Sequence, residues 1–139
     1  MRTTIYRSIF LGLALGVSAG AWSRNLAGQW DLKIENREHH VVTALVIEFT
    51  AHPAQTCEDG IWLRVHVVSS TTEDSKFFPL SDPLSYNVEN NRLVLDHGAV
   101  CDGGGFLPGA LDDETVHGKY ISGARGLRQL GFFTLTKRK

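Results

Sequence analysis

The sequence lacks an excess of charge of either sign: its 139 residues carry a formal net charge of only -1 at pH 7. Its basic residues are scattered rather than clustered, so we expect neither nucleic acid nor an anionic membrane surface as a partner. Beyond the N-terminal segment, no stretch of about ten residues or more shows a helical apolar stripe with capping residues. These absences leave an all-β class as the expectation.

Long apolar runs are also missing. The one near the N-terminus, Ile9 to Val17, is about half the roughly 20 residues that a membrane-spanning helix needs. Arginines precede this run, and the small residues Ala19 and Ala21 follow it in the pattern of a secretory cleavage site. We therefore predict that residues 1–21 are a signal peptide removed after export, and we expect no transmembrane span.

The remaining residues, 22–139, have the length of a single domain, and we expect it in a secreted or periplasmic monomer. Its two cysteines, Cys57 and Cys101, lie in loop-like contexts in a chain sent to an oxidising compartment. A disulfide between them is the natural pairing. Because neither cysteine belongs to a CxxC pair, the sequence predicts no metal site and no cofactor.

Alternation of apolar and polar residues is the main structural signal. Trp30, Leu32 and Ile34 alternate with charged residues, which is typical of a half-buried strand. Asn90 and Asn91 tolerate positive φ and predict a hairpin turn. Strands are expected in residues 29–35, 41–49, 61–69, 76–80, 114–122 and 128–138, with two more in the hairpin 84–98. About eight strands joined by short links predict an antiparallel up-and-down barrel, with a β-sandwich as the alternative.

Few side chains point to chemistry. Trp62, Arg64 and His66 share one face of a predicted strand and are taken as candidate ligand-binding residues. The adjacent pair His39 and His40 is expected to be a solvated turn, because neighbouring residues in extended chain point to opposite faces. The glycine-rich stretch 101–109 lacks the ending of a phosphate-binding loop and is expected to be a mobile loop.

The tripeptide Gly28 to Trp30, with the pattern G-x-W at the head of the first strand, resembles the start of lipocalin-type and other calycin barrels. The resemblance implies that Trp30 closes the barrel base and that a late basic residue packs over it, Arg138 or else Arg128. The chain departs from classical lipocalins by being shorter and by lacking their T-D-Y motif. This leaves open whether the barrel holds a deep cup or is filled.

Two functions follow as expectations. The first is a binding protein that holds an apolar or amphipathic small molecule in its barrel. The alternative is a protein-binding barrel that inhibits an envelope or extracellular hydrolase, such as a protease or lysozyme, through its loops. An enzyme ranks third, because no nucleophile, base and acid can be grouped from their spacing.

Overall fold

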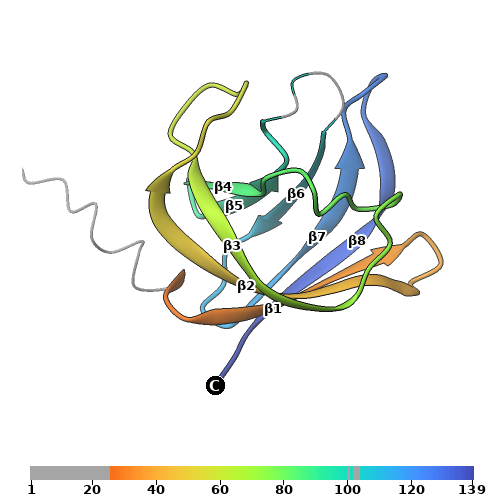
Figure 1. The fold of residues 1–139 in the computed structure, drawn as a ribbon, viewed down its shortest axis with the longest axis horizontal. Helices are drawn as coiled ribbons and strands as arrows, with labels where there is room; N and C mark the ends of the chain where they lie inside the picture. Colours follow the sequence, from red (N-terminus) through yellow and green to blue (C-terminus); the bar gives the residue numbers. More distant parts are fainter. Residues whose placement is uncertain (1–25, 100, 102–103) are drawn as a thin grey trace, which may run out of the picture.

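The structure is a computed structural model that describes residues 26–99, 101 and 104–139. The predicted signal peptide, 1–21, lies outside the described residues. Within them, the chain forms eight β-strands, drawn as arrows in Figure 1. The strands are β1 (Gln29–Asn36), β2 (Val41–Pro53), β3 (Leu63–Thr72), β4 (Ser85–Glu89), β5 (Arg92–Asp96), β6 (Gly105–Ala110), β7 (Thr115–Ser122) and β8 (Arg128–Lys137).

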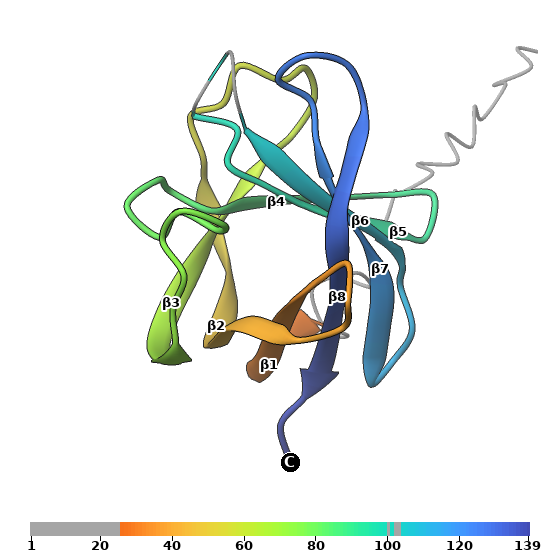
Figure 2. The same cartoon turned by 90° about the vertical axis from the view of Figure 1, so that its right-hand side faces the viewer.

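Each strand pairs antiparallel with the next one in the chain, and β8 pairs with β1 to close the barrel. The strongly twisted wall is visible in the two views of Figures 1 and 2. Closure removes the unpaired edges that an open sheet of this length would present. The prediction of an all-β, eight-stranded up-and-down barrel is thus confirmed over the sandwich, and the fold is compatible with a calycin-like barrel.

The core lies inside the barrel and follows from the period-2 pattern of the strands. In β1, Trp30, Leu32 and Ile34 are fully buried, while Lys33 faces solvent. The register places Leu32 opposite Leu135 and Ile34 opposite Phe133, so inward residues of neighbouring strands meet on the same face. Each buried side chain of this size contributes roughly 1.5 to 3 kcal/mol through removal from water.

The expected strand pattern needs two corrections. Residues 76–80 form turns rather than a strand, and the stretch expected to be a mobile loop contains β6. A Cβ atom at Gly105 would lie 2.4 Å from the ring of Tyr120, and one at Gly109 would lie 2.6 Å from Val116. These glycines therefore permit close packing inside the barrel, which a sequence pattern alone does not distinguish from flexibility.

The first strand begins at a bend that only glycine adopts easily. Gly28 has a φ of 93°, in the left-handed region. Two residues later Trp30 is fully buried, and its indole Nε1 donates a hydrogen bond to the carbonyl oxygen of Leu26 at 3.1 Å. The edge of its ring meets Phe49 in a T-shaped contact, with 5.9 Å between the centroids. The bend thus lets the chain turn so that the tryptophan enters the core.

The cation over this tryptophan is Lys137, whose Nζ lies 5.6 Å from the ring centroid. The sequence-based expectation of Arg138 is corrected here. Lys137 is the register partner of Trp30 and shares its face of the sheet, whereas Arg138 places Nε 3.5 Å from a carboxylate oxygen of the outward residue Asp31. Arg128, the other candidate, stands at the opposite end of β8.

The predicted disulfide between Cys57 and Cys101 is confirmed, with 5.4 Å between the two Cα atoms. It joins the β2–β3 loop to the β5–β6 loop. The backbone NH of Cys57 also donates a hydrogen bond to the carbonyl oxygen of Gly98 at 2.8 Å. The two loops are therefore held together by a covalent bond and a backbone hydrogen bond. A disulfide is compatible with a protein outside the cytoplasm.

Candidate functional site

The seam between β3 and β4 is the weakest part of the barrel wall. These strands pair only at Leu63 with Tyr86 and at Arg64 with Ser85, whereas β7 and β8 pair along nearly their whole length. Within the described chain, the second part of β3 has no partner in β4. Residues 73–84, which connect the two strands, form turns there instead of a ladder. Beyond the two ladder pairs, the backbone NH of Val65 donates a hydrogen bond to the carbonyl oxygen of Leu84 at 2.9 Å, and side chains hold the rest of this wall.

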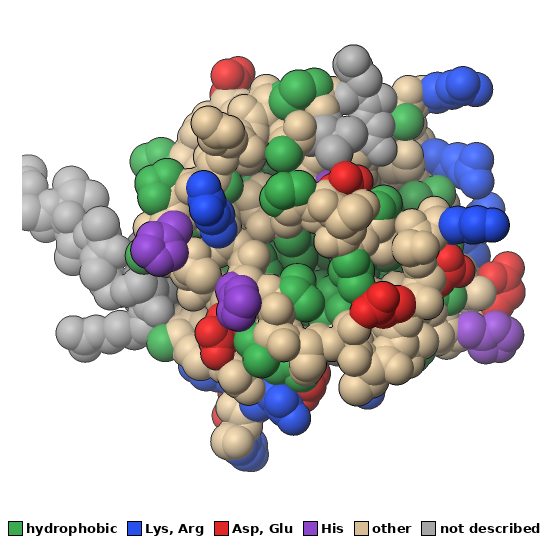
Figure 3. Space-filling view, viewed as in Figure 1, with side chains coloured by type: hydrophobic (Ala, Val, Ile, Leu, Met, Phe, Trp, Pro, Cys, Tyr) green, Lys and Arg blue, Asp and Glu red, His purple; other side chains and the backbone are tan. Residues whose placement is uncertain are grey.

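Hydrophobic side chains gather in a hollow at the centre of the face shown in Figure 3, between β3 and the segment 73–84. We call this the seam hollow. Several hydrophobic residues pack against the core without being fully covered, and those on β3 and on the segment 73–84 are Leu63, Val67, Phe77 and Leu80. The β2–β3 register explains why Val67 faces inward, because it lies opposite the fully buried Ile47.

One aromatic cluster enters the core from the base of the barrel. Phe49 contacts Trp30 on one side and Tyr86 on the other, with 4.9 Å between the centroids of Phe49 and Tyr86. The hydroxyl of Tyr86 donates a hydrogen bond to the carbonyl oxygen of Thr50 at 2.7 Å. This bond ties β4 to β2 across β3 and so reinforces the short β3–β4 ladder.

A second aromatic cluster holds the segment 73–84 against the opposite end. Phe78 is 1% exposed and packs on Tyr120 and on His97, with ring centroids 5.6 and 4.6 Å away. The hydroxyl of Tyr120 donates a hydrogen bond to the carbonyl oxygen of Phe77 at 3.0 Å. Burial raises the pKa of Tyr120 to about 12, so it remains a neutral donor. The segment is thereby fixed as one border of the seam hollow.

Two polar atoms in the core have no hydrogen-bond partner among the described residues: Nε2 of His97 and Oγ1 of Thr43. Both side chains are nearly or fully buried, at 2% and 0% exposure. Burial lowers the pKa of His97, although the nearby charge of Asp82 and backbone contacts oppose the shift. The imidazole is therefore neutral near pH 7. Buried polar atoms are usually paired, so these two atoms are unusual within the core.

Asp96 precedes this histidine and faces the other side of β5. Burial, and then the charge of Glu58 in the β2–β3 loop, raise the pKa of Asp96 to about 6. The backbone of His97 opposes this shift through a hydrogen bond. The disulfide-linked loop therefore brings a second carboxylate near Asp96, and the charge of Asp96 changes in the mildly acidic range.

The candidate ligand-binding residues from the sequence lie on β3, apart from Trp62, which lies just before it. Arg64 and His66 are exposed on the outer face of β3, and Arg64 Nε donates a hydrogen bond to the carbonyl oxygen of Pro53 at 3.0 Å. Trp62 is half-buried and its Nε1 bonds to the carbonyl oxygen of Asp59. Arg64 and His66 therefore face away from the interior of the barrel, and the ligand-binding role of the three residues stays a prediction. Sequence alternation did place Val67 on the opposite, inward face, but no sequence signal marked the unpaired seam beside it.

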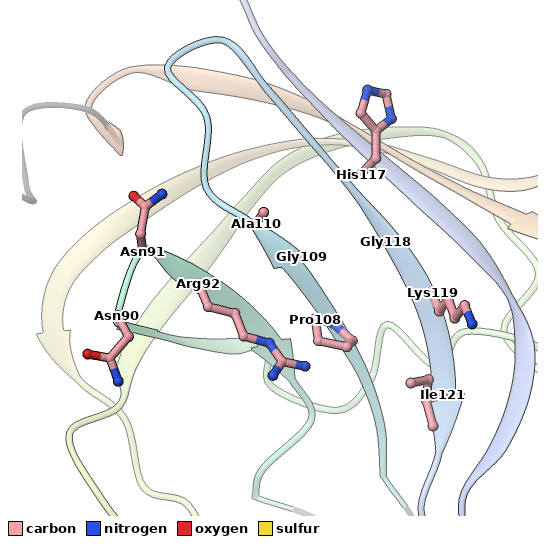
Figure 4. A pocket seen from close by; sticks show the side chains of 10 residues that line it. All are labelled: Asn90, Asn91, Arg92, Pro108, Gly109, Ala110, His117, Gly118, Lys119 and Ile121. Atoms are coloured by element: carbon pink, nitrogen blue, oxygen red, sulfur yellow. The ribbon is translucent and has the colours of Figure 1, made fainter.

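A separate groove of about 630 Å³ crosses the outer face of β5, β6 and β7. Figure 4 shows its lining side chains from close by. Arg92 comes from β5, while His117 and Lys119 come from β7. Between them, β6 contributes only the short outward residues Pro108 and Ala110. The groove is therefore polar and basic at its sides and apolar along its floor.

The remaining features give weaker support for a functional site. His39 and His40 are exposed beside the β1–β2 turn, and the His39 ring stacks on Phe132 with 4.3 Å between centroids. Among the described residues, no group of three or more potential metal-binding side chains is arranged to hold an ion. The described part of the chain also has no helix that is long and apolar enough to cross a membrane. No family model, curated protein or solved structure matches the chain.

Proposed function

We propose that this chain is a secreted or periplasmic binding protein that takes an apolar or amphipathic small molecule at the seam hollow. The observation that supports this function best is the set of inward-facing hydrophobic residues beside the unpaired part of β3, represented by Val67, that remain partly exposed. Apolar surface of this kind gains about 25 cal/mol for each Å² that a ligand removes from water. The disulfide between the two loops is compatible with the proposed location outside the cytoplasm.

The two unpartnered polar atoms favour a ligand with a polar end. His97 is neutral near pH 7, so its Nε2 is either a donor or an acceptor, depending on the tautomer. The hydroxyl of Thr43 can serve as both. A hydroxyl or carbonyl group on an otherwise apolar chain or ring matches these partners. A fully charged group does not, because the surrounding core would desolvate it.

A pair of neighbouring valines provides the test. Val67 faces inward on the part of β3 that has no partner in β4, whereas Val68 faces outward and is 41% exposed. Binding of the neutral fluorescent probe N-phenylnaphthylamine to the folded, oxidised protein should be saturable and should be displaced by a long-chain fatty alcohol. Val67→Arg should weaken probe binding by about tenfold or more, which corresponds to ~1.4 kcal/mol. Val68→Arg should leave it within about twofold of the parent.

Circular dichroism melts of both variants separate loss of binding from loss of fold. A parent protein that shows no saturable binding would overturn the proposal. So would equal weakening by the two arginine variants, because the outer substitution does not reach the hollow. His97→Phe should reduce the affinity for the alcohol more than that for the probe, since only the alcohol has a hydroxyl to pair with Nε2.

A second candidate function, inhibition of an envelope or extracellular hydrolase, is favoured by two exposed apolar side chains. Ile61 and Leu127 are each 80% exposed, in the β2–β3 and β7–β8 loops. These loops lie at the same end of the barrel in Figures 1 and 2. Assays against a lysozyme and a panel of secreted proteases would test this function, with Ile61→Ser and Leu127→Ser expected to relieve any inhibition.

A further inference from the structure

The outer groove over β6 is built by a difference in side-chain length. Ala110 is the register partner of Arg92, and Pro108 is the partner of Val94. On the other side Gly109 pairs with Gly118, so neither glycine raises the floor. Figure 4 shows Arg92 extending from β5 toward Pro108, with Lys119 and Ile121 on β7 beyond it. Long cationic side chains thus stand on both sides of a low apolar floor.

The charges of the groove have one sign. None of the residues that line it is acidic, although the whole chain has a formal net charge of -1. Arg92 and Lys119 are both exposed, and neither forms an ion pair with a described residue. Glu89, the cross-strand neighbour of Arg92, lines an adjacent hollow that Arg92 also borders, but the two side chains are not within ion-pair distance. Two cations are therefore available to a negatively charged ligand.

The spacing of the cations fits an extended peptide. Neighbouring strands lie about 4.8 Å apart, so the strands that carry Arg92 and Lys119 are separated by roughly 10 Å. In an extended chain, side chains at positions i and i+2 point the same way and are about 7 Å apart. The long arginine and lysine side chains can close the remaining difference. The residue between two such carboxylates points away from the groove, so the methylene groups of the two acidic side chains would lie over the floor.

Polar groups at one end of the groove suit a peptide backbone. Asn90 and Asn91 form the tip of the β4–β5 hairpin and both have positive φ, at 51° and 60°. Asn91 uses its side-chain amide to donate a hydrogen bond to the carbonyl oxygen of Leu111 at 3.2 Å. The Asn90 side chain has no hydrogen bond to a described residue and lines the groove. It can therefore pair with a main-chain group of a bound segment.

We propose that this groove binds an acidic, extended peptide segment of a partner protein, with carboxylates on Arg92 and Lys119 and the methylene groups of these acidic side chains on Pro108, Ala110 and Ile121. Arginine binds carboxylates through paired donors in a fixed geometry. The complementarity of charge selects acidic segments and speeds their association. The groove lies on the outer wall, so this inference is independent of ligand binding at the seam hollow.

The test uses the folded, oxidised protein and a fluorescent synthetic peptide that alternates glutamate and valine. Fluorescence anisotropy should show saturable binding that weakens as salt screens the charges. The variant Arg92→Gln/Lys119→Gln should reduce the affinity about tenfold or more. The matched control Lys76→Gln/Arg125→Gln removes the same charge from exposed residues outside the groove and should change the affinity less than about twofold.

Charge reversal gives a second, positive readout. The variant Arg92→Glu/Lys119→Glu should lose the glutamate peptide and gain binding of a peptide that alternates lysine and valine. Because both side chains are exposed, these variants should retain the fold, which circular dichroism checks. A peptide of glutamine and valine should bind weakly.

Three results would overturn the proposal. The first is the absence of saturable binding by the glutamate peptide up to about 1 mM, which corresponds to only ~4 kcal/mol of affinity. The second is an equal loss in the Lys76→Gln/Arg125→Gln control, because it would indicate attraction by net charge alone. The third is displacement of the peptide by inorganic phosphate at equal concentration, because this would indicate a site for small anions.

Discussion

Replacing Trp30 with alanine tests the idea that this residue closes the base of the barrel. The side chain is fully buried and donates a hydrogen bond from Nε1 to the carbonyl oxygen of Leu26. It also contacts Phe49 and carries the Lys137 ammonium over its ring. Removing a buried tryptophan costs about 3 to 5 kcal/mol, because the cavity adds to the lost transfer free energy. Loss of the hydrogen bond and the cation–π contact places the expectation in the upper half of that range.

The measurement is equilibrium unfolding in urea, followed by circular dichroism with the disulfide intact. A loss of about 4 kcal/mol corresponds to a fall in Tm of roughly 15 °C for a domain of this size. Trp62→Ala is the matched control, because Trp62 is half-buried outside the barrel and should cost less than about 2 kcal/mol. The reasoning is refuted if Trp30→Ala loses less than about 1 kcal/mol, or no more than Trp62→Ala loses.

Two further predictions concern the disulfide and the pH dependence of stability. The double variant Cys57→Ser/Cys101→Ser should be less stable than the oxidised parent by roughly 4 kcal/mol, because the bond closes a loop with a sequence separation of 44; equal urea midpoints for the two proteins would contradict this. Asp96 has a pKa of about 6 in the fold, above its value in an unfolded chain, so the folded state holds its proton more tightly. Its contribution to the free energy of unfolding should therefore fall as the pH rises from about 4 to about 6 and stay low above that range. Asp96→Asn should flatten this part of the stability profile and stabilise the protein at neutral pH, and an unchanged slope between those pH values would count against the assignment.

Several elements could be predicted from the residues alone, because their signals are local. Strict alternation identified the strand around Trp30, and the two asparagines at positions 90 and 91 identified the hairpin turn, where both residues have positive φ. The disulfide followed from having only two cysteines in a chain with an export signal pattern. In each case the information lies within a few residues or in a simple count.

The predictions from the sequence were wrong where residues far apart in the chain decide the local structure. The stretch that contains β6 has the composition of a flexible loop, yet Gly105 and Gly109 are inside the wall because Tyr120 and Val116 occupy the space that a Cβ would need. The reverse error occurred at residues 76–80, a short apolar stretch that was predicted to be a strand and forms turns. Their phenylalanines are held by Tyr120 on β7 and by His97, which directly follows β5, rather than by a ladder.

The sequence by itself determined the class of fold, because the pattern of inward and outward side chains depends only on the period of an extended chain. It also determined the end of the barrel at which Trp30 stands. The tertiary structure alone decided that Lys137, rather than Arg138, lies over that tryptophan, because this depends on how β8 is registered against β1. It likewise decided where the wall is left unpaired and which cations flank β6, since both depend on contacts between strands far apart in the chain.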